Sequence, residues 1–127
     1  MNFKKMIDMI RLRPGVYIWD PNLITLQTYI DGYLISLTIN KIEDDFDKTF
    51  REYFNFWIQH RIRNDYRKNE VIYRDLQYNN ARGYTTLISL IELDSNKQLE
   101  LFFKYFDLFY EDYLKGIDFE SIMRLYI

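Results

Sequence analysis

The chain has 127 residues, the usual length of one domain, so we expect a single domain over residues 1–127. It is 48% hydrophobic and 28% charged with only four Gly and two Pro, which is typical of a folded globular protein. A chain without Cys has no disulfide, thiolate nucleophile or Cys-ligated zinc, and its one His, His60, excludes a multi-histidine metal site. We therefore expect no enzyme, no catalytic residues, no metal site and no cofactor.

Aromatic residues make up 19% of the chain, with twelve Tyr, ten Phe and two Trp. These rings can fill the core of a small domain and leave some for its surface. The net charge is −2, and bases outnumber acids seven to four only between residues 51 and 82. The overall balance gives no reason to expect binding to nucleic acid.

The first residues resemble neither a secretory signal nor a membrane anchor. Asp8 and Arg11 interrupt the apolar residues that follow the two lysines at positions 4 and 5. The longest apolar runs are a few residues, far short of the roughly 20 that a spanning helix needs. We expect no membrane contact and a cytoplasmic location.

The first 40 residues predict two helices. Residues 2–12 form an amphipathic helix that ends before Pro14-Gly15, with an apolar face made of Phe3, Met6, Ile7 and Ile10. Residues 16–19 are expected to be extended, with Tyr17 and Trp19 pointing inward. The second helix begins after Asp20 as N-cap, with Pro21 at its first position, and continues to about Asn40. Its apolar stripe consists of Leu23, Leu26, Ile30, Tyr33, Leu34 and Leu37.

The third helix starts in the acidic segment 43–45 and ends near three basic residues at positions 60, 61 and 63. Acids at its start and bases at its end suit the helix dipole. Its stripe consists of Phe46, Phe50, Tyr53, Phe54, Trp57, Ile58 and Ile62. Residues 64–82 predict mostly loop, with one helical turn at most.

The last third predicts two helices and a final turn. The fourth helix, near residues 84–91, has the apolar positions Tyr84, Leu87, Ile88 and Ile91. Ser95 and Gln98 have the spacing of a capping box at the start of a fifth helix, which Gly116 ends. The stripe of that helix consists of Leu99, Phe102, Phe103, Phe106, Phe109, Tyr110, Tyr113 and Leu114. A turn or short helix follows Asp118.

Five amphipathic stripes with short connections indicate an all-α fold, a single-domain bundle of about five helices. A variant with short strands at residues 16–19 and 71–76 stays open.

The densest group of carboxylates lies before the third helix, at Glu43, Asp44, Asp45 and Asp47. A calcium loop needs alternate acidic ligands and a Gly in mid-loop, and this segment has neither. The acids can offset the helix dipole and can also face a basic partner. We predict them as partner-binding residues.

A second group lies on the fifth helix. Asp107 and Glu111 are one turn apart, so their like charges repel mildly unless a cationic partner covers them. Tyr is enriched at the energetic centres of interfaces, which makes Tyr110 and Tyr113 candidates beside these acids, although core packing can account for at least one of them.

The segment 60–68 is basic and contains Tyr66, a pattern that can bind a nucleic-acid backbone and its bases. Asp65 and the net negative charge of the chain weigh against that function. A small helical nucleic-acid-associated regulator and a carboxylate-dependent enzyme stay as alternatives.

Several motifs resemble those of small helical bacterial immunity proteins encoded beside polymorphic or contact-dependent toxins. They cover about residues 6–114 and consist of Arg13-Pro14 with Tyr17-Ile18, Asp31-Gly32-Tyr33, Phe54 with Trp57, and Leu99-Glu100-Leu101-Phe102-Phe103 with Phe106-Asp107 and Phe109. The resemblance implies a cytoplasmic protein that binds and neutralises a cognate toxin domain, with a nuclease as the expected class. Such families vary the binding face, so the resemblance assigns no contact residue.

Overall fold

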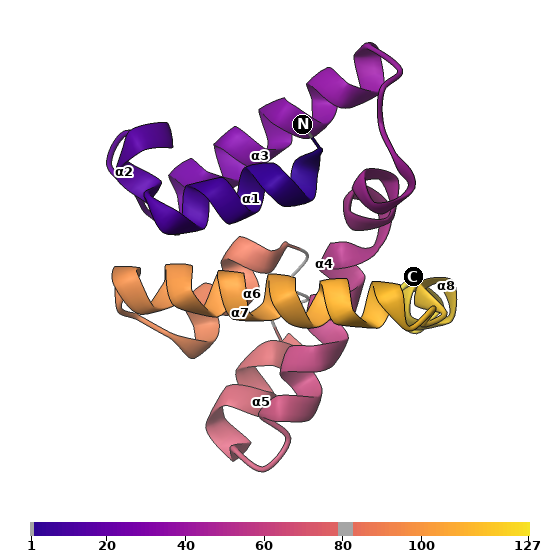
Figure 1. Cartoon of the computed structure of the whole chain (residues 1–127). Helices are drawn as coiled ribbons and strands as arrows, with labels where there is room; N and C mark the ends of the chain where they lie inside the picture. Colours follow the sequence, from indigo (N-terminus) through magenta and orange to yellow (C-terminus); the bar gives the residue numbers. More distant parts are fainter. Residues whose placement is uncertain (1, 79–82) are drawn as a thin grey trace. The chain divides into compact units, whose positions relative to one another are not determined.

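A computed structural model of the chain describes residues 2–78 and 83–127, and all regular structure in these ranges is helical (Figure 1). The helices are α1 (Phe3–Leu12), α2 (Pro14–Tyr17), α3 (Leu23–Ile39), α4 (Asp45–Asp65), α5 (Glu70–Tyr78), α6 (Tyr84–Ile91), α7 (Ser95–Leu114) and α8 (Phe119–Arg124). The all-α prediction is confirmed. The predicted number of about five helices is wrong, because the described residues form eight.

The described chain divides into two compact units, unit 1 (residues 1–52) and unit 2 (residues 53–127), with the boundary inside α4. The expectation of a single domain stays a prediction.

Unit 1 is built on the apolar faces of α1 and α3. The predicted face of α1 is confirmed, with all four of its members buried, and Asn2 caps the helix by accepting from the Lys5 N–H at 2.9 Å. On α3 the buried residues are Leu23, Leu26, Ile30, Leu34 and Leu37. The Phe3 ring joins the two helices, since its centroid lies 6.3 Å from that of Tyr33, and it also packs 4.6 Å from Phe50 of α4.

The segment between α1 and α3 differs from its prediction. Pro14–Tyr17 forms the short helix α2, because Pro suits a first helical position. The next residue, Ile18, is extended, and it is buried. Trp19 is 92% exposed, so the expectation that it points inward is wrong.

Helix α3 begins two residues later than predicted. Asn22 is the N-cap: its Oδ1 accepts from the Thr25 N–H, and the Thr25 hydroxyl oxygen accepts from the Asn22 N–H, both at 3.0 Å. Asp20, the predicted cap, lies before the helix with φ 51°. The predicted N-cap is wrong because Asn22 and Thr25 form this reciprocal pair, which satisfies two backbone N–H groups at once.

Both predicted phenylalanine stripes form buried surfaces. In unit 2 the ring centroid of Phe54 lies 5.2 Å from that of Phe109 and 6.0 Å from that of Phe102, in edge-to-face geometry. Tyr105 extends this core toward the end of α4, where its hydroxyl donates to Asp65 Oδ2 at 2.9 Å. Among the phenylalanines of the two stripes Phe103 is the exception, since it is only half-buried. Leu114, the last member of the predicted stripe on α7, is 69% exposed, so its assignment to the buried face is wrong.

The segment predicted as loop contains α5, which begins with Glu70 at its acidic first turn. Its residues 71–76 are therefore helical, and neither proposed strand exists among the described residues. Residues 64 and 65 of the predicted loop belong to α4, residues 66–69 connect α4 to α5, and residues 79–82 lie outside the described residues. Leu76 is buried, and its carbonyl accepts from Arg63 Nη2 at 3.4 Å.

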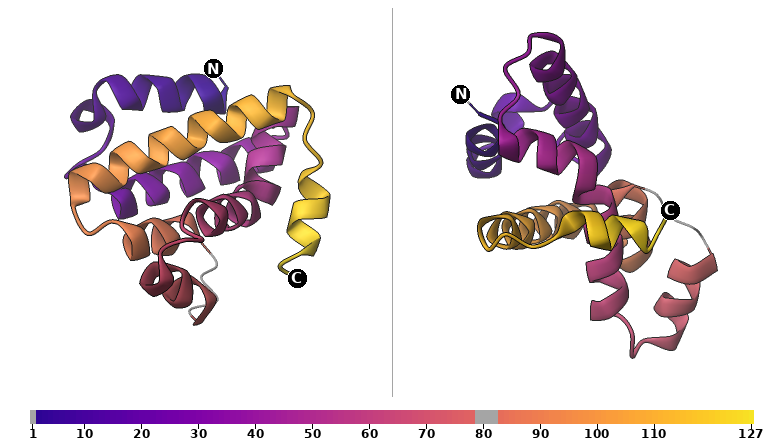
Figure 2. Two further views of the ribbon diagram at one scale, coloured as in Figure 1. Left: turned by 90° about the horizontal axis from the view of Figure 1, so that it is seen from below. Right: turned by 90° about the vertical axis from the view of Figure 1, so that its right-hand side faces the viewer.

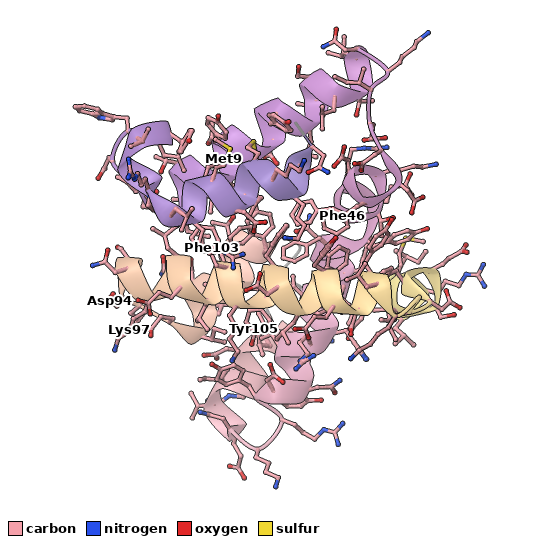
Figure 3. All side chains as sticks on the ribbon, viewed as in Figure 1. Met9, Phe46, Asp94, Lys97, Phe103 and Tyr105 are labelled. Carbon is pink, nitrogen blue, oxygen red and sulfur yellow. The ribbon has the colours of Figure 1, made fainter. Side chains whose placement is uncertain are left out.

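Helix α6 matches its predicted range, and α7 starts with a different cap. Asp94 Oδ1 accepts from the Lys97 N–H at 3.0 Å, and Figure 3 shows both residues at the beginning of α7. Ser95 is the first helical residue, and the Gln98 amide donates to the Glu92 carbonyl at 2.8 Å. The prediction of a Ser95–Gln98 capping box is therefore wrong.

Gly116 ends α7 as predicted, with φ 75° and its N–H donating to the Tyr113 carbonyl at 3.1 Å. Asp118 then caps α8, accepting from the Ser121 N–H at 3.2 Å. After this turn α8 runs crosswise to α7 (Figure 2). None of the described helices has the length and apolarity needed to cross a membrane.

Candidate partner-binding surfaces

The acids at the start of α4 serve the helix itself. Asp44 Oδ1 accepts from the Asp47 N–H at 2.8 Å, and Asp47 Oδ2 accepts from the Asp44 N–H at 3.0 Å. This reciprocal pair is a capping box built from two Asp. Asp44 and Asp47 thus stabilise the start of α4, as expected for acids at a helix N-terminus.

Asp47 does not lie on the surface. Its side chain is 1% exposed, and its second carboxylate oxygen accepts from the Phe3 N–H at 3.3 Å. Burial raises the pKa of Asp47 above its ordinary value. A partner protein cannot reach a carboxylate enclosed in this way, so the prediction of Asp47 as a contact residue does not fit the structure.

Glu43 is engaged by two neighbours in unit 1. Arg51 donates to it through Nε at 2.7 Å and through Nη2 at 3.0 Å, and the Thr38 hydroxyl donates at 3.1 Å. The guanidinium lowers the pKa of Glu43. Of the four acids predicted here, Asp44 and Asp45 are the two classed as exposed.

The second predicted group lies in unit 2. Glu111 is exposed, whereas Asp107, Tyr110 and Tyr113 are half-buried. The two tyrosine rings pack edge to face with centroids 6.2 Å apart. Neighbouring Asp112 has a structural role, because the Trp57 indole N–H donates to its Oδ2 at 3.0 Å. Helix α7 thus presents one exposed acid beside a tyrosine pair.

The basic segment of α4 contacts its own unit. The Nδ1 atom of His60 lies 2.9 Å from the Tyr126 hydroxyl, and the Arg63 guanidinium lies 5.1 Å from the centre of the same ring. Arg61 pairs with Asp65 at 3.4 Å. These contacts give the segment a local packing role and do not favour the nucleic-acid alternative.

A shallow pocket of about 300 Å³ lies in unit 2 between α6 and α7, with Tyr66 at its side. Lys97 and Lys104 line it together with the acids Glu92 and Glu100. Because both signs of charge are present, the lining selects no class of ligand. In the described part of the chain, no group of three or more His, Asp or Glu side chains could hold a metal ion.

An apolar surface on unit 1 was missed by sequence reasoning. Ile24, Ile35 and Ile39 are 67%, 58% and 72% exposed, on the side of α3 that faces away from its buried leucines. The signal was present in the sequence, because these isoleucines lie off the leucine stripe and place apolar side chains on a second side of the helix. The leucine stripe accounts for only one face of α3.

Comparison of the chain with protein-family models, with curated proteins and with solved structures found no match. The immunity-protein resemblance therefore stays a prediction, and function has to be argued from these surfaces.

Proposed function

We propose that this chain is an immunity protein that binds a cognate bacterial toxin domain in the cytoplasm and neutralises it by covering a functional surface. A nuclease is the toxin class that we expect. The proposal joins the resemblance of the sequence motifs to the surface features of the two units.

The main support is the concentration of exposed apolar side chains in unit 1. Nine of the fifteen large apolar side chains exposed among the described residues lie there, although unit 1 is the shorter unit. Apolar area left in water is a loss of free energy that a partner protein can recover, and large patches of this kind mark interaction sites. Trp19 is the most exposed of the nine, and Trp is enriched among residues that dominate binding energy.

The exposed acids give this proposal its electrostatic part. Asp44 and Asp45 lie at the start of α4, and Glu111 lies beside the tyrosine pair of α7. A nuclease binds phosphates with a basic cleft, so acids on its inhibitor speed association by attraction at long range. Charge removal is therefore expected to change the association rate more than the dissociation rate.

The test uses the toxin domain encoded by the neighbouring reading frame, produced with this chain and separately. We expect a complex with a nanomolar dissociation constant, as in other tight protein pairs, and rescue of growth when both are expressed. The combined variant Asp44→Asn and Asp45→Asn should slow association by roughly tenfold at low salt. Asn at position 44 keeps a capping oxygen, so the helix stays intact.

The matched control is Glu70→Gln, which removes an exposed acid at the start of α5, outside the predicted surfaces. It should leave the association rate unchanged. Failure of the toxin domain to bind would overturn the proposed function. If the toxin domain binds tightly but the Asp44 and Asp45 variant has an unchanged association rate, these two acids are not part of the interface.

A further inference from the structure

One side of α3 carries a continuous exposed stripe, the α3 stripe, made of Ile24, Thr28, Asp31, Ile35 and Ile39. The steps of four, three, four and four residues keep these positions on one side of a helix that turns about 100° per residue. All five are exposed. The Thr28 hydroxyl donates to the Ile24 carbonyl at 3.0 Å, so its polar group is satisfied within the helix.

The spacing indicates the shape of what covers the stripe. Steps of three and four residues are those of a surface on which two helices pack, where each side chain inserts between residues of the facing helix. From Ile24 to Ile39 the stripe is about 22 Å long at 1.5 Å per residue. A facing helix of about four turns matches that length.

Asp31 determines the charge of the partner. It lies in the middle of the stripe and has no hydrogen-bond or ion-pair partner among residues 2–78 and 83–127. Partial desolvation already raises the pKa of Asp31. Covering this carboxylate with an apolar surface would bury an unpaired charge, which is costly, whereas a Lys or Arg on the facing helix would pair with it.

A second copy of this chain that packs through its own α3 stripe does not supply that cation. Helix α3 contains no Lys or Arg, so two α3 stripes packed together would leave both Asp31 carboxylates without a partner. A cationic helix of a different protein therefore matches the stripe better than a symmetric dimer through α3 does.

We propose that the α3 stripe binds an amphipathic helix of a partner protein, one whose apolar seam carries a Lys or Arg opposite Asp31. The inference rests on one part of the proposed function, that the chain acts by binding another protein. It adds that the partner places a cationic side chain opposite the α3 stripe.

The test uses two synthetic 21-residue amphipathic helices with Leu at the seam positions, identical except for Lys or Glu at the central one. Binding to the full chain is followed by fluorescence anisotropy of the labelled peptides. The Lys peptide should bind at least about tenfold more tightly than the Glu peptide. Asp31→Asn should remove most of this preference, because it removes the charge and keeps the size of the side chain.

Two further variants separate the stripe from the rest of α3. Ile35→Ser should weaken the Lys peptide about tenfold or more through lost apolar burial. Ser36→Ala, one residue away and off the stripe, should leave it unchanged. Circular dichroism and thermal unfolding check that both variants fold as the parent does.

Four results would overturn the inference. They are no binding of the Lys peptide, equal binding of both peptides, a preference that survives Asp31→Asn, and a dimer in sedimentation that Ile35→Ser abolishes, since a second copy would then be the occupant. No toxin is present in the peptide assay, so a negative peptide result does not contradict the proposed toxin binding. Likewise, a toxin domain that fails to bind does not change the interpretation of the peptide result.

Discussion

Asp47 accepts a hydrogen bond from the backbone N–H of Phe3, 44 positions earlier in the chain, at 3.3 Å. The same carboxylate accepts from the Asp44 N–H at 3.0 Å. One side chain thus satisfies the first residue of α1 and the residue that precedes α4. The sequence predicts Asp47 on the surface, but its carboxylate is buried in unit 1 and accepts hydrogen bonds from two separate segments of the chain.

Replacing Asp47 by Ala should therefore lower the free energy of unfolding. The change leaves two backbone N–H groups without their acceptor and removes half of the capping box, for a loss of about 2–3 kcal/mol. Urea unfolding followed by circular dichroism measures it. Asp45→Ala, at the exposed neighbouring acid, should change stability by no more than about 0.5 kcal/mol. Equal effects of the two substitutions would contradict the structural role of Asp47.

Glu43 and Arg51 make a pH-dependent contribution to stability. The Arg51 guanidinium lowers the pKa of Glu43 below its ordinary value of 4.5, so the folded state releases this proton more readily than the unfolded state. The pair therefore stabilises the fold above pH 4.5, and this contribution is lost as the pH falls through the lowered pKa.

Glu43→Gln should accordingly cost about 0.5–1 kcal/mol at pH 7, the size of a pair with one partly exposed member, and almost nothing near pH 2. Urea unfolding at a series of pH values gives the comparison. Glu70→Gln, which removes an exposed carboxylate on α5, serves as the control. A Glu43→Gln cost that is constant with pH would show that the ion pair is not its source.

The two tryptophans occupy opposite environments. Trp57 is 3% exposed and donates to Asp112, whereas Trp19 is almost fully exposed. Trp19→Phe should leave stability within about 0.5 kcal/mol and shift the emission of the folded protein to shorter wavelength, because the remaining tryptophan is buried. Trp57→Phe should cost about 2 kcal/mol or more through lost packing and an unpaired Asp112. A blue-shifted spectrum for Trp57→Phe would contradict this assignment.

The sequence predicted the parts of the fold that depend on local spacing. Phe54 and Phe109 lie on stripes with steps of three and four residues, and such stripes are buried whatever the connections between them. The end of α7 at Gly116 was predictable for a similar reason, because Gly adopts positive φ without strain. These features need no knowledge of distant contacts.

The helix starts were harder, because several capping residues stand close together. Asp20 and Asn22 both suit the start of α3, and Asp94 and Ser95 both suit the start of α7. The choice depends on which side chain reaches a backbone N–H, as Asn22 and Asp94 do. Sequence spacing alone gives both candidates in each pair.

The candidate surfaces depended on tertiary position, and there the sequence was weakest. Apolarity predicts Trp19 to be buried, and negative charge predicts Asp47 to be exposed, and the structure reverses both. Ile35 and Ile39 were overlooked because the leucines of α3 already accounted for one face. Trp19, Ile35 and Ile39 contribute to the exposed apolar surface of unit 1, and Asp47 makes hydrogen bonds inside it.

Helices α3 and α7 end in the same way with different residues at the turn. In α3 the Ile42 N–H donates to the Leu37 carbonyl, and in α7 the Ile117 N–H donates to the Asp112 carbonyl, at 3.0 and 3.2 Å. Both are Schellman turns, which need positive φ at one position. That position is Lys41 in α3, with φ 57°, and Gly116 in α7, with φ 75°.

The matched substitutions should therefore have opposite effects. Lys41→Gly relieves the strain of a side chain in the left-handed region and should raise the free energy of unfolding by about 0.5–1 kcal/mol. Gly116→Ala introduces that strain and should lower it by about 1 kcal/mol, although no atom lies within 4 Å of the added Cβ. Urea unfolding of the two variants measures both signs. A loss in each would mean that the lysine side chain stabilises α3 by more than its backbone strain costs.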